Sequence, residues 1–161
     1  MSPDDPATLF AAHLDDITRR TAAALAACRY DGLLLQAGEP PGLFLDDQAY
    51  PFHPHPPFKA WVPAADVAGS YLYFEPGRRP RLLFHRFEDY WHRSAELPAE
   101  PWVEAFDVVV TGSRAAARAA LPASLGRIAY IGQPFPELLD WGIGAINPEH
   151  PRHRLDYDPA P

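Results

Sequence analysis

The chain has 161 residues, of which 47% are hydrophobic and 12% aromatic, and its formal net charge at pH 7 is −7. This length is typical of one domain, and the aromatic content excludes a chain that is disordered throughout. The acidic balance opposes electrostatic binding of nucleic acid, and no apolar run approaches the about 20 residues of a membrane span. The acidic N-terminus does not resemble a secretory signal, so the cytoplasm is the expected compartment.

Residues 7–28 predict an amphipathic helix. Phe10, Leu14, Ile17 and Cys28 recur close to the 3.6-residue period of one helix face, and charged residues occupy the opposite face. Cys28 lies on the apolar stripe and is expected to be a small buried hydrophobe. As the single cysteine of the chain, it excludes an internal disulfide and a cysteine-based zinc site.

Five short apolar runs bounded by turn residues predict strands. They lie at residues 33–37, 70–75, 81–86, 105–112 and 127–132. The first run is expected to be a buried central strand and the fourth a buried strand, while the second and third form a hairpin. A helix is predicted over 113–125 with Ser113 as its N-cap, and a short helix over 133–144.

The order of these elements is typical of an α/β protein. Because a hairpin interrupts the alternation, the sheet is expected to be mixed, with five or six strands and helices on both faces. The predicted architecture is therefore a three-layer α/β/α domain.

Residues 44–63, FLDDQAYPFHPHPPFKAWVP, contain an unusual number of titratable and aromatic side chains for one short segment. Asp46 and Asp47 either cap a turn and face water, or lie at a half-buried edge where one carboxylate needs a cationic partner. A substrate ammonium, Lys59 or an arginine could be that partner.

His53 and His55 lie two residues apart, so in an extended segment both imidazoles could reach one ion. A zinc site needs three or four protein ligands, and no partner motif accompanies the pair. Two solvent-facing histidines are the favoured interpretation, and a small independent metalloenzyme is the alternative. The sequence also contains no nucleophile elbow and no phosphate-binding glycine motif.

Five short sequence motifs along the chain are typical of one protein family. They are FLDD at 44–47, YPF at 50–52, FKAW at 58–61, DYWH at 89–92 and AYIG at 129–132. With them the chain resembles the N-terminal domain of bacterial Xaa-Pro dipeptidases, or prolidases. The resemblance implies a creatinase/prolidase-like, ribonuclease H-like domain over 1–150, and the start of a linker over 151–161.

The resemblance implies that the parent protein is a cytoplasmic homodimeric metallopeptidase. By the resemblance it would hydrolyse dipeptides with a C-terminal proline and use two divalent metal ions, manganese, in a catalytic domain absent from this chain. The domain would cover the active site of the partner subunit and contact substrate there in trans. The chain alone would then hold no catalytic residue, metal ligand or cofactor, and would be inactive. No nucleic-acid or membrane partner is implied.

The same resemblance assigns roles to individual residues. Asp47 is implied to reach the free amino end of the substrate in the partner subunit, with Trp91 as a wall of that pocket and His92 beside it. The residues implied to shape the loop are Asp46, Tyr50, Phe52, Lys59 and Trp61. A stand-alone α/β module that binds a ligand or a protein through this aromatic loop is the alternative function.

Overall fold

A computed structural model describes residues 5–43, 45, 48–86 and 95–143 of the chain. Within them, five strands form one mixed sheet in the order β4-β3-β2-β1-β5. The strands are β1 (Gly32–Gln36), β2 (Tyr71–Phe74), β3 (Arg81–His85), β4 (Asp107–Thr111) and β5 (Ile128–Ile131). The β1–β5 and β3–β4 pairs are parallel, and the other two are antiparallel. The predicted mixed sheet is confirmed.

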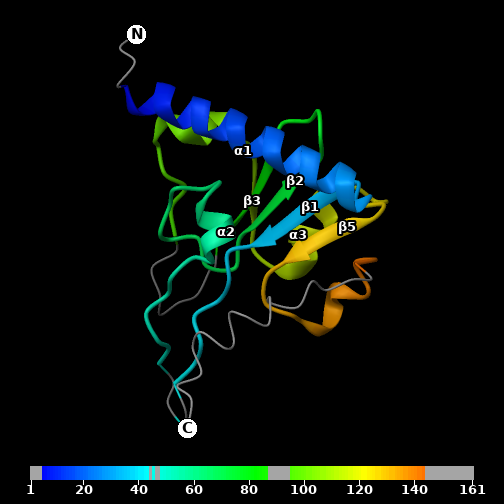
Figure 1. The fold of residues 1–161 in the computed structure, drawn as a ribbon. Coiled ribbons are helices and arrows are strands. Elements are labelled where there is room, and N and C mark those ends of the chain that lie inside the picture. Colours follow the sequence, from blue (N-terminus) through cyan, green and yellow to red (C-terminus); the bar gives the residue numbers. More distant parts are fainter. Residues whose placement is uncertain (1–4, 44, 46–47, 87–94, 144–161) are drawn as a thin grey trace, which may run out of the picture.

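Helices cover both faces of this sheet, which makes the predicted three layers (Figure 1). Helix α1 (Pro6–Cys28) crosses one face, together with α2 (Pro56–Lys59) and the 3₁₀ helix η1 (Pro101–Ala105). Helix α3 (Arg114–Ala120) and the 3₁₀ helix η2 (Pro136–Leu138) lie on the other. No helix within the described residues is both long and apolar enough to cross a membrane.

Alternation along the strands divides the core into two halves. Leu33 and Leu35 of β1 pack on the α1 side, whereas Leu34 packs on the α3 side. Successive strand side chains point to opposite faces, so a strand covered on both faces must be apolar at every position. Strand β1 is buried along its whole length and has partners on both edges, which confirms the predicted central strand.

Three expectations about the elements are wrong in part. Strand β4 is at the edge of the described sheet, and Val110 on it is 53% exposed, so this strand is not buried. The short helix expected over 133–144 is reduced to one 3₁₀ turn, because Pro134 and Pro136 each remove a backbone N–H. Helix α3 ends at Ala120, before Pro122, although Ser113 caps it as predicted by accepting a hydrogen bond from the Ala116 N–H (3.1 Å).

Candidate functional site: a projecting arm and its root

A two-stranded arm, residues 39–53, projects from the sheet where β1 ends. In Figure 1 it extends far below the sheet, in cyan, before it returns to α2. Two hydrogen bonds join its strands: the Tyr50 N–H donates to Pro41 O, and the Leu43 N–H donates to Gln48 O, both at 2.9 Å. An antiparallel bridge between Gly42 and Ala49 lies between them. The arm is therefore a hairpin with its own ladder.

The outer part of the arm exposes large apolar side chains. Leu45 is 92% exposed and Tyr50 is 55% exposed. Leu45 also has a left-handed φ of 58°, a conformation that branched side chains such as leucine rarely adopt outside turns. Exposed apolar groups on a projecting element are typical of surfaces that contact another molecule.

The three residues implied to contact substrate, and one of those implied to shape the loop, are among those that the structure does not describe. Asp46 and Asp47 belong to the segment between Leu43 and Gln48, and they lie outside the described residues, as do Trp91 and His92. The roles inferred for these side chains stay predictions.

The other residues of the aromatic stretch divide between arm and core. Trp61 is 2% exposed, and its ring packs at a tilt against Phe74 of β2 with 5.1 Å between the ring centroids. Phe52 is half-buried and packs against the same α1-side core. Tyr50 and Lys59 are exposed. Trp61 and Phe52 thus fix the returning half of the stretch on the body, while Tyr50 lies out on the arm.

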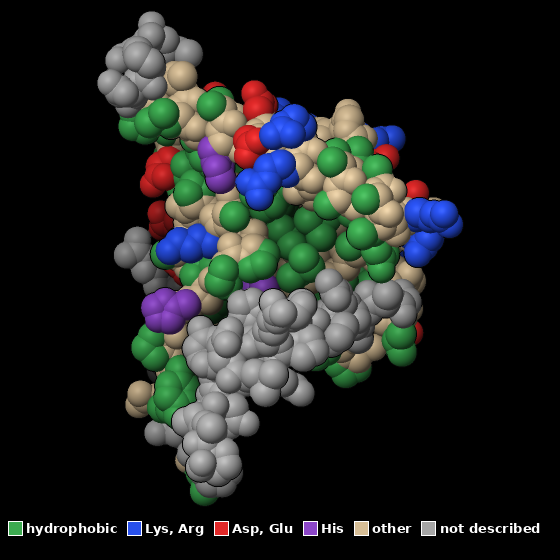
Figure 2. Space-filling model, viewed as in Figure 1, with side chains coloured by type: hydrophobic (Ala, Val, Ile, Leu, Met, Phe, Trp, Pro, Cys, Tyr) green, Lys and Arg blue, Asp and Glu red, His purple; other side chains and the backbone are tan. Residues whose placement is uncertain are grey.

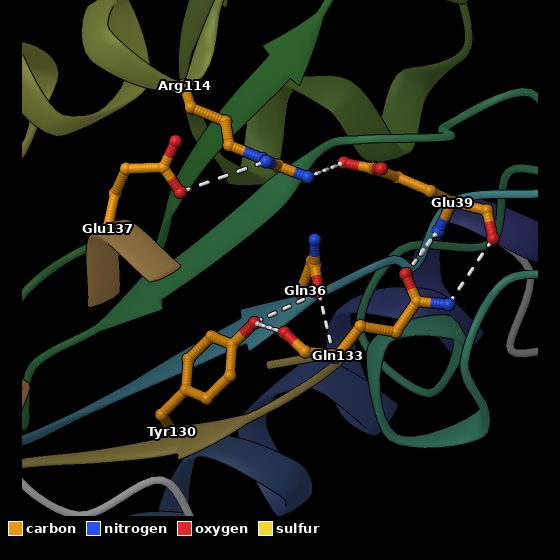
Figure 3. Close-up of polar contacts among 6 residues, drawn as sticks. All are labelled: Gln36, Glu39, Arg114, Tyr130, Gln133 and Glu137. Carbon is orange, nitrogen blue, oxygen red and sulfur yellow. Dashed lines mark hydrogen bonds and ion pairs between the residues drawn. The ribbon is translucent and has the colours of Figure 1, made fainter. Parts of the chain in front are cut away.

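The root of the arm rests on a polar network between the ends of β1 and β5 (Figure 3). Gln36 is 1% exposed, and its Oε1 accepts a hydrogen bond from the Gln133 N–H (2.8 Å). The Tyr130 hydroxyl lies 2.9 Å from the same Oε1 and 2.7 Å from the Gln133 carbonyl oxygen. An added Cβ at Gly132 would lie 2.5 Å from the Cβ of Gln36, so only glycine permits this approach.

Glu39, the first residue of the arm, is held through its main chain and its side chain. Its N–H donates to Gln133 Oε1 (3.0 Å), and its carbonyl accepts from Gln133 Nε2 (3.3 Å). Its carboxylate accepts from Arg114 at the start of α3 (2.7 Å), which raises the pKa of the guanidinium. Arg114 also lies 3.9 Å from a Glu137 carboxylate oxygen and over the Phe135 ring. Figure 3 shows Arg114 and Gln133, from two different segments, meeting at Glu39.

Two buried tyrosines beside this network have raised pKa values. Burial raises the pKa of Tyr71 to about 12, and the Glu39 carboxylate adds to the shift while Arg114 opposes it. Burial likewise raises the pKa of Tyr130, with a smaller contribution from Tyr71. Both phenols therefore stay protonated in the folded chain at a pH where the unfolded chain has lost these protons.

The free energy of unfolding is expected to decrease as the pH rises from about 10 to 12. Each retained proton contributes a slope of about 1.4 kcal/mol per pH unit in this window, because the folded state then binds more protons than the unfolded state. Tyr130→Phe should reduce the slope by about that amount. Urea unfolding of both proteins between pH 9 and 12 measures it, and equal slopes would contradict the prediction.

A cavity of about 230 Å³ lies at the arm root, between the arm and the end of β5. Gln36, Gln133, Phe52, His53 and His55 are among its lining residues. His53 is exposed as expected, but His55 is half-buried and its ring Nδ1 is buried, so the expectation of two solvent-facing histidines is wrong for His55. Within the described part of the chain, no three His, Cys, Asp or Glu side chains form a group that could hold a metal ion.

A second concavity, an apolar groove of about 630 Å³, runs between α1 and the β1–β5 end of the sheet. Figure 2 shows its hydrophobic floor at the centre of this face. Cys28 lines the groove and is exposed, so its predicted burial is wrong. The helical period placed Cys28 on the apolar face correctly, but no described residue covers that end of the face.

The network at the root was not predicted from the sequence. The sequence does contain one pattern that relates to this network. A glutamine lies at the end of β1, in LLLQ at 33–36, and another just after β5, in YIGQ at 130–133, and these two strands are parallel neighbours. The carboxyl ends of parallel neighbours meet at one edge of a sheet. The pairing of β1 with β5 was needed to bring Gln36 and Gln133 together, and they are 97 residues apart.

The three layers and the projecting arm define the class of this protein: an α/β domain that presents one loop away from its core. A family model described as Xaa-Pro dipeptidase, N-terminal domain, matches residues 8–157. The chain belongs to this family, which confirms the resemblance noted in the sequence.

Proteins named Xaa-Pro dipeptidase are similar over almost the whole chain. Those of Cronobacter sakazakii and Escherichia coli are 40% identical over 149 and 152 residues, which are 91% and 94% of this chain. That of Pseudoalteromonas atlantica is 36% identical over 154 residues, 96% of this chain. The aligned residues make up 33–35% of these relatives, so the chain spans about a third of their length.

Proposed function

We propose that this domain is the non-catalytic N-terminal part of a homodimeric, cytoplasmic Xaa-Pro dipeptidase and that it covers the active site of the partner subunit. The observation that carries the proposal is the arm. It projects from the body, exposes Leu45 and Tyr50, and encloses the segment with Asp46 and Asp47 between its two strands. An element of this shape can reach beyond its own domain.

Asp47 is proposed to pair with the free α-amino group of the substrate. A dipeptidase must distinguish a dipeptide from a longer peptide, and a carboxylate at a fixed distance from the scissile bond can do so. Only the ammonium of a dipeptide would then reach it. An ammonium–carboxylate pair removed from water contributes a few kcal/mol, whereas an exposed pair gives under about 1 kcal/mol. Trp91 and His92 would form the pocket wall that excludes water.

The arm would not carry out the hydrolysis itself. The family resemblance assigns two divalent metal ions, manganese, to a catalytic domain that follows this one, and there they would activate the attacking water. The described residues of this chain gather no metal-ligand group. Their proposed part is to orient the substrate amino group and to close the pocket.

Two proteins test this function: the full-length protein that contains this domain, and the chain of residues 1–161. The full-length protein, supplied with Mn²⁺, should hydrolyse dipeptides with a C-terminal proline and leave the corresponding tripeptides intact. The 1–161 chain should hydrolyse neither. A full-length protein without dipeptidase activity, or an isolated chain that has it, would overturn the proposal.

A further inference from the structure

We propose that Gln133 is a positioning residue that sets the direction in which the arm leaves the sheet. Through the arm it would control how tightly the substrate amino group is held, a consequence that rests on the proposed function. The basis is the pair of hydrogen bonds between the Gln133 side chain and the main chain of Glu39.

The two bonds run in opposite senses. The Glu39 N–H donates to Gln133 Oε1, and the Glu39 carbonyl accepts from Gln133 Nε2. One primary amide thereby fixes the peptide groups on both sides of a single residue. A side chain with only a donor or only an acceptor could bond only one of these two peptide groups.

Glu39 is the position where such a constraint has most effect. The preceding residue, Gly38, has a φ of 96°, a conformation open mainly to glycine, and its carbonyl accepts a hydrogen bond from the Gly69 N–H (2.8 Å). The following residues, Pro40 and Pro41, have restricted φ angles. With the Gly38 carbonyl held by Gly69, the bond from Gln133 to the Glu39 carbonyl sets where this stiff dipeptide points, and with it the outgoing strand of the arm.

Gln133 is itself anchored to the rigid centre of the sheet. Its N–H donates to the buried Gln36 Oε1 on β1, and its carbonyl lies 2.7 Å from the Tyr130 hydroxyl on β5. The arm root is thus tied to two neighbouring strands at once. Arg114 adds an ion pair to the Glu39 carboxylate, but both partners are about 40% exposed, and solvent weakens such a pair.

The test is kinetic and uses the full-length protein with two substrates, an Xaa-Pro dipeptide and its desamino analogue, in which a hydrogen replaces the ammonium without lengthening the molecule. Gln133→Ala should raise KM for the free dipeptide about 3- to 10-fold, as expected for one or two lost neutral hydrogen bonds. Its kcat should change less than about 2-fold, because the contact with the amino group is the same in ground and transition states. The desamino analogue should be affected much less.

Two further variants separate positioning from general loss of structure. In an Asp47→Asn background, Gln133→Ala should cause less than about a 2-fold further loss, because both changes act through one contact. The control is Arg78→Ala, which breaks the exposed Arg78–Glu75 ion pair (3.1 Å) at the β2–β3 turn, away from the arm, and should change neither constant. Since Gln133 is exposed, its alanine variant should keep the fold, as circular dichroism would show.

The outcomes distinguish this inference from the function on which it rests. A wild-type protein with no Xaa-Pro dipeptidase activity rejects both. An active wild type with unchanged kinetics for Gln133→Ala rejects the positioning role alone. Equal losses for both substrates, a loss in kcat without one in KM, or losses that multiply with Asp47→Asn would also reject it.

Discussion

Replacing Trp61 by alanine is expected to lower the free energy of unfolding of this chain by about 3–5 kcal/mol, the usual cost of truncating a buried large aromatic side chain. Trp61 is almost fully buried in the α1-side core, and its ring packs against Phe74 of the central part of the sheet. The neighbouring Phe58 and Val62 are also fully buried, so the cavity left behind has no flexible edge through which to collapse. Urea unfolding followed by circular dichroism measures the loss.

Tyr50→Ala is the matched control, because it truncates an aromatic residue of the same stretch that lies out on the arm. Its side chain is more than half exposed, so the free energy of unfolding should change by no more than about 0.5 kcal/mol. Equal destabilisation by the two variants would mean that the arm is packed against the body in solution. A stable Trp61→Ala protein would contradict the placement of Trp61 in the core.

The second large effect concerns Asp47. In the full-length protein, Asp47→Asn should lower kcat/KM for a free Xaa-Pro dipeptide about 30- to 1,000-fold, which corresponds to the 2–4 kcal/mol of a buried charge pair that loses one partner. The metal content should stay unchanged. Asp66→Asn, at an exposed acid on the body, makes the same charge change and should leave kcat/KM unaltered. Unchanged kinetics for Asp47→Asn would remove the proposed role.

A mixing experiment tests whether Asp47 acts across the dimer. Asp47→Asn subunits are reassembled with subunits whose Asp47 is intact but whose catalytic domain is inactivated by substitution. In the mixed dimer, the working active site would receive an intact arm from its partner, so activity should reappear. If the arm served its own subunit, no combination would exceed the activity of the Asp47→Asn protein.

The sequence by itself determined the long N-terminal helix, the five strands and the class of the fold. The 3.6-residue period of 7–28, the continuous apolar run of 33–37 and the hairpin between 70 and 86 are local patterns, and each corresponds to an observed element. Their order restricted the fold to a mixed α/β sheet with helices on both faces. The family motifs within residues 44–61 identified the part of the sequence to which most of the arm belongs.

Only the tertiary structure decided what each side chain in these elements faces. Trp61 and Tyr50 belong to one aromatic stretch, yet Trp61 is buried in the core and Tyr50 lies on the surface of the arm. Cys28 lies on the apolar face of its helix, but burial also requires a second element over it, and periodicity carries no information about that element. Gln36 and Gln133 meet because β1 and β5 pair in parallel, and such pairing joins residues far apart in the chain, beyond the reach of any local pattern.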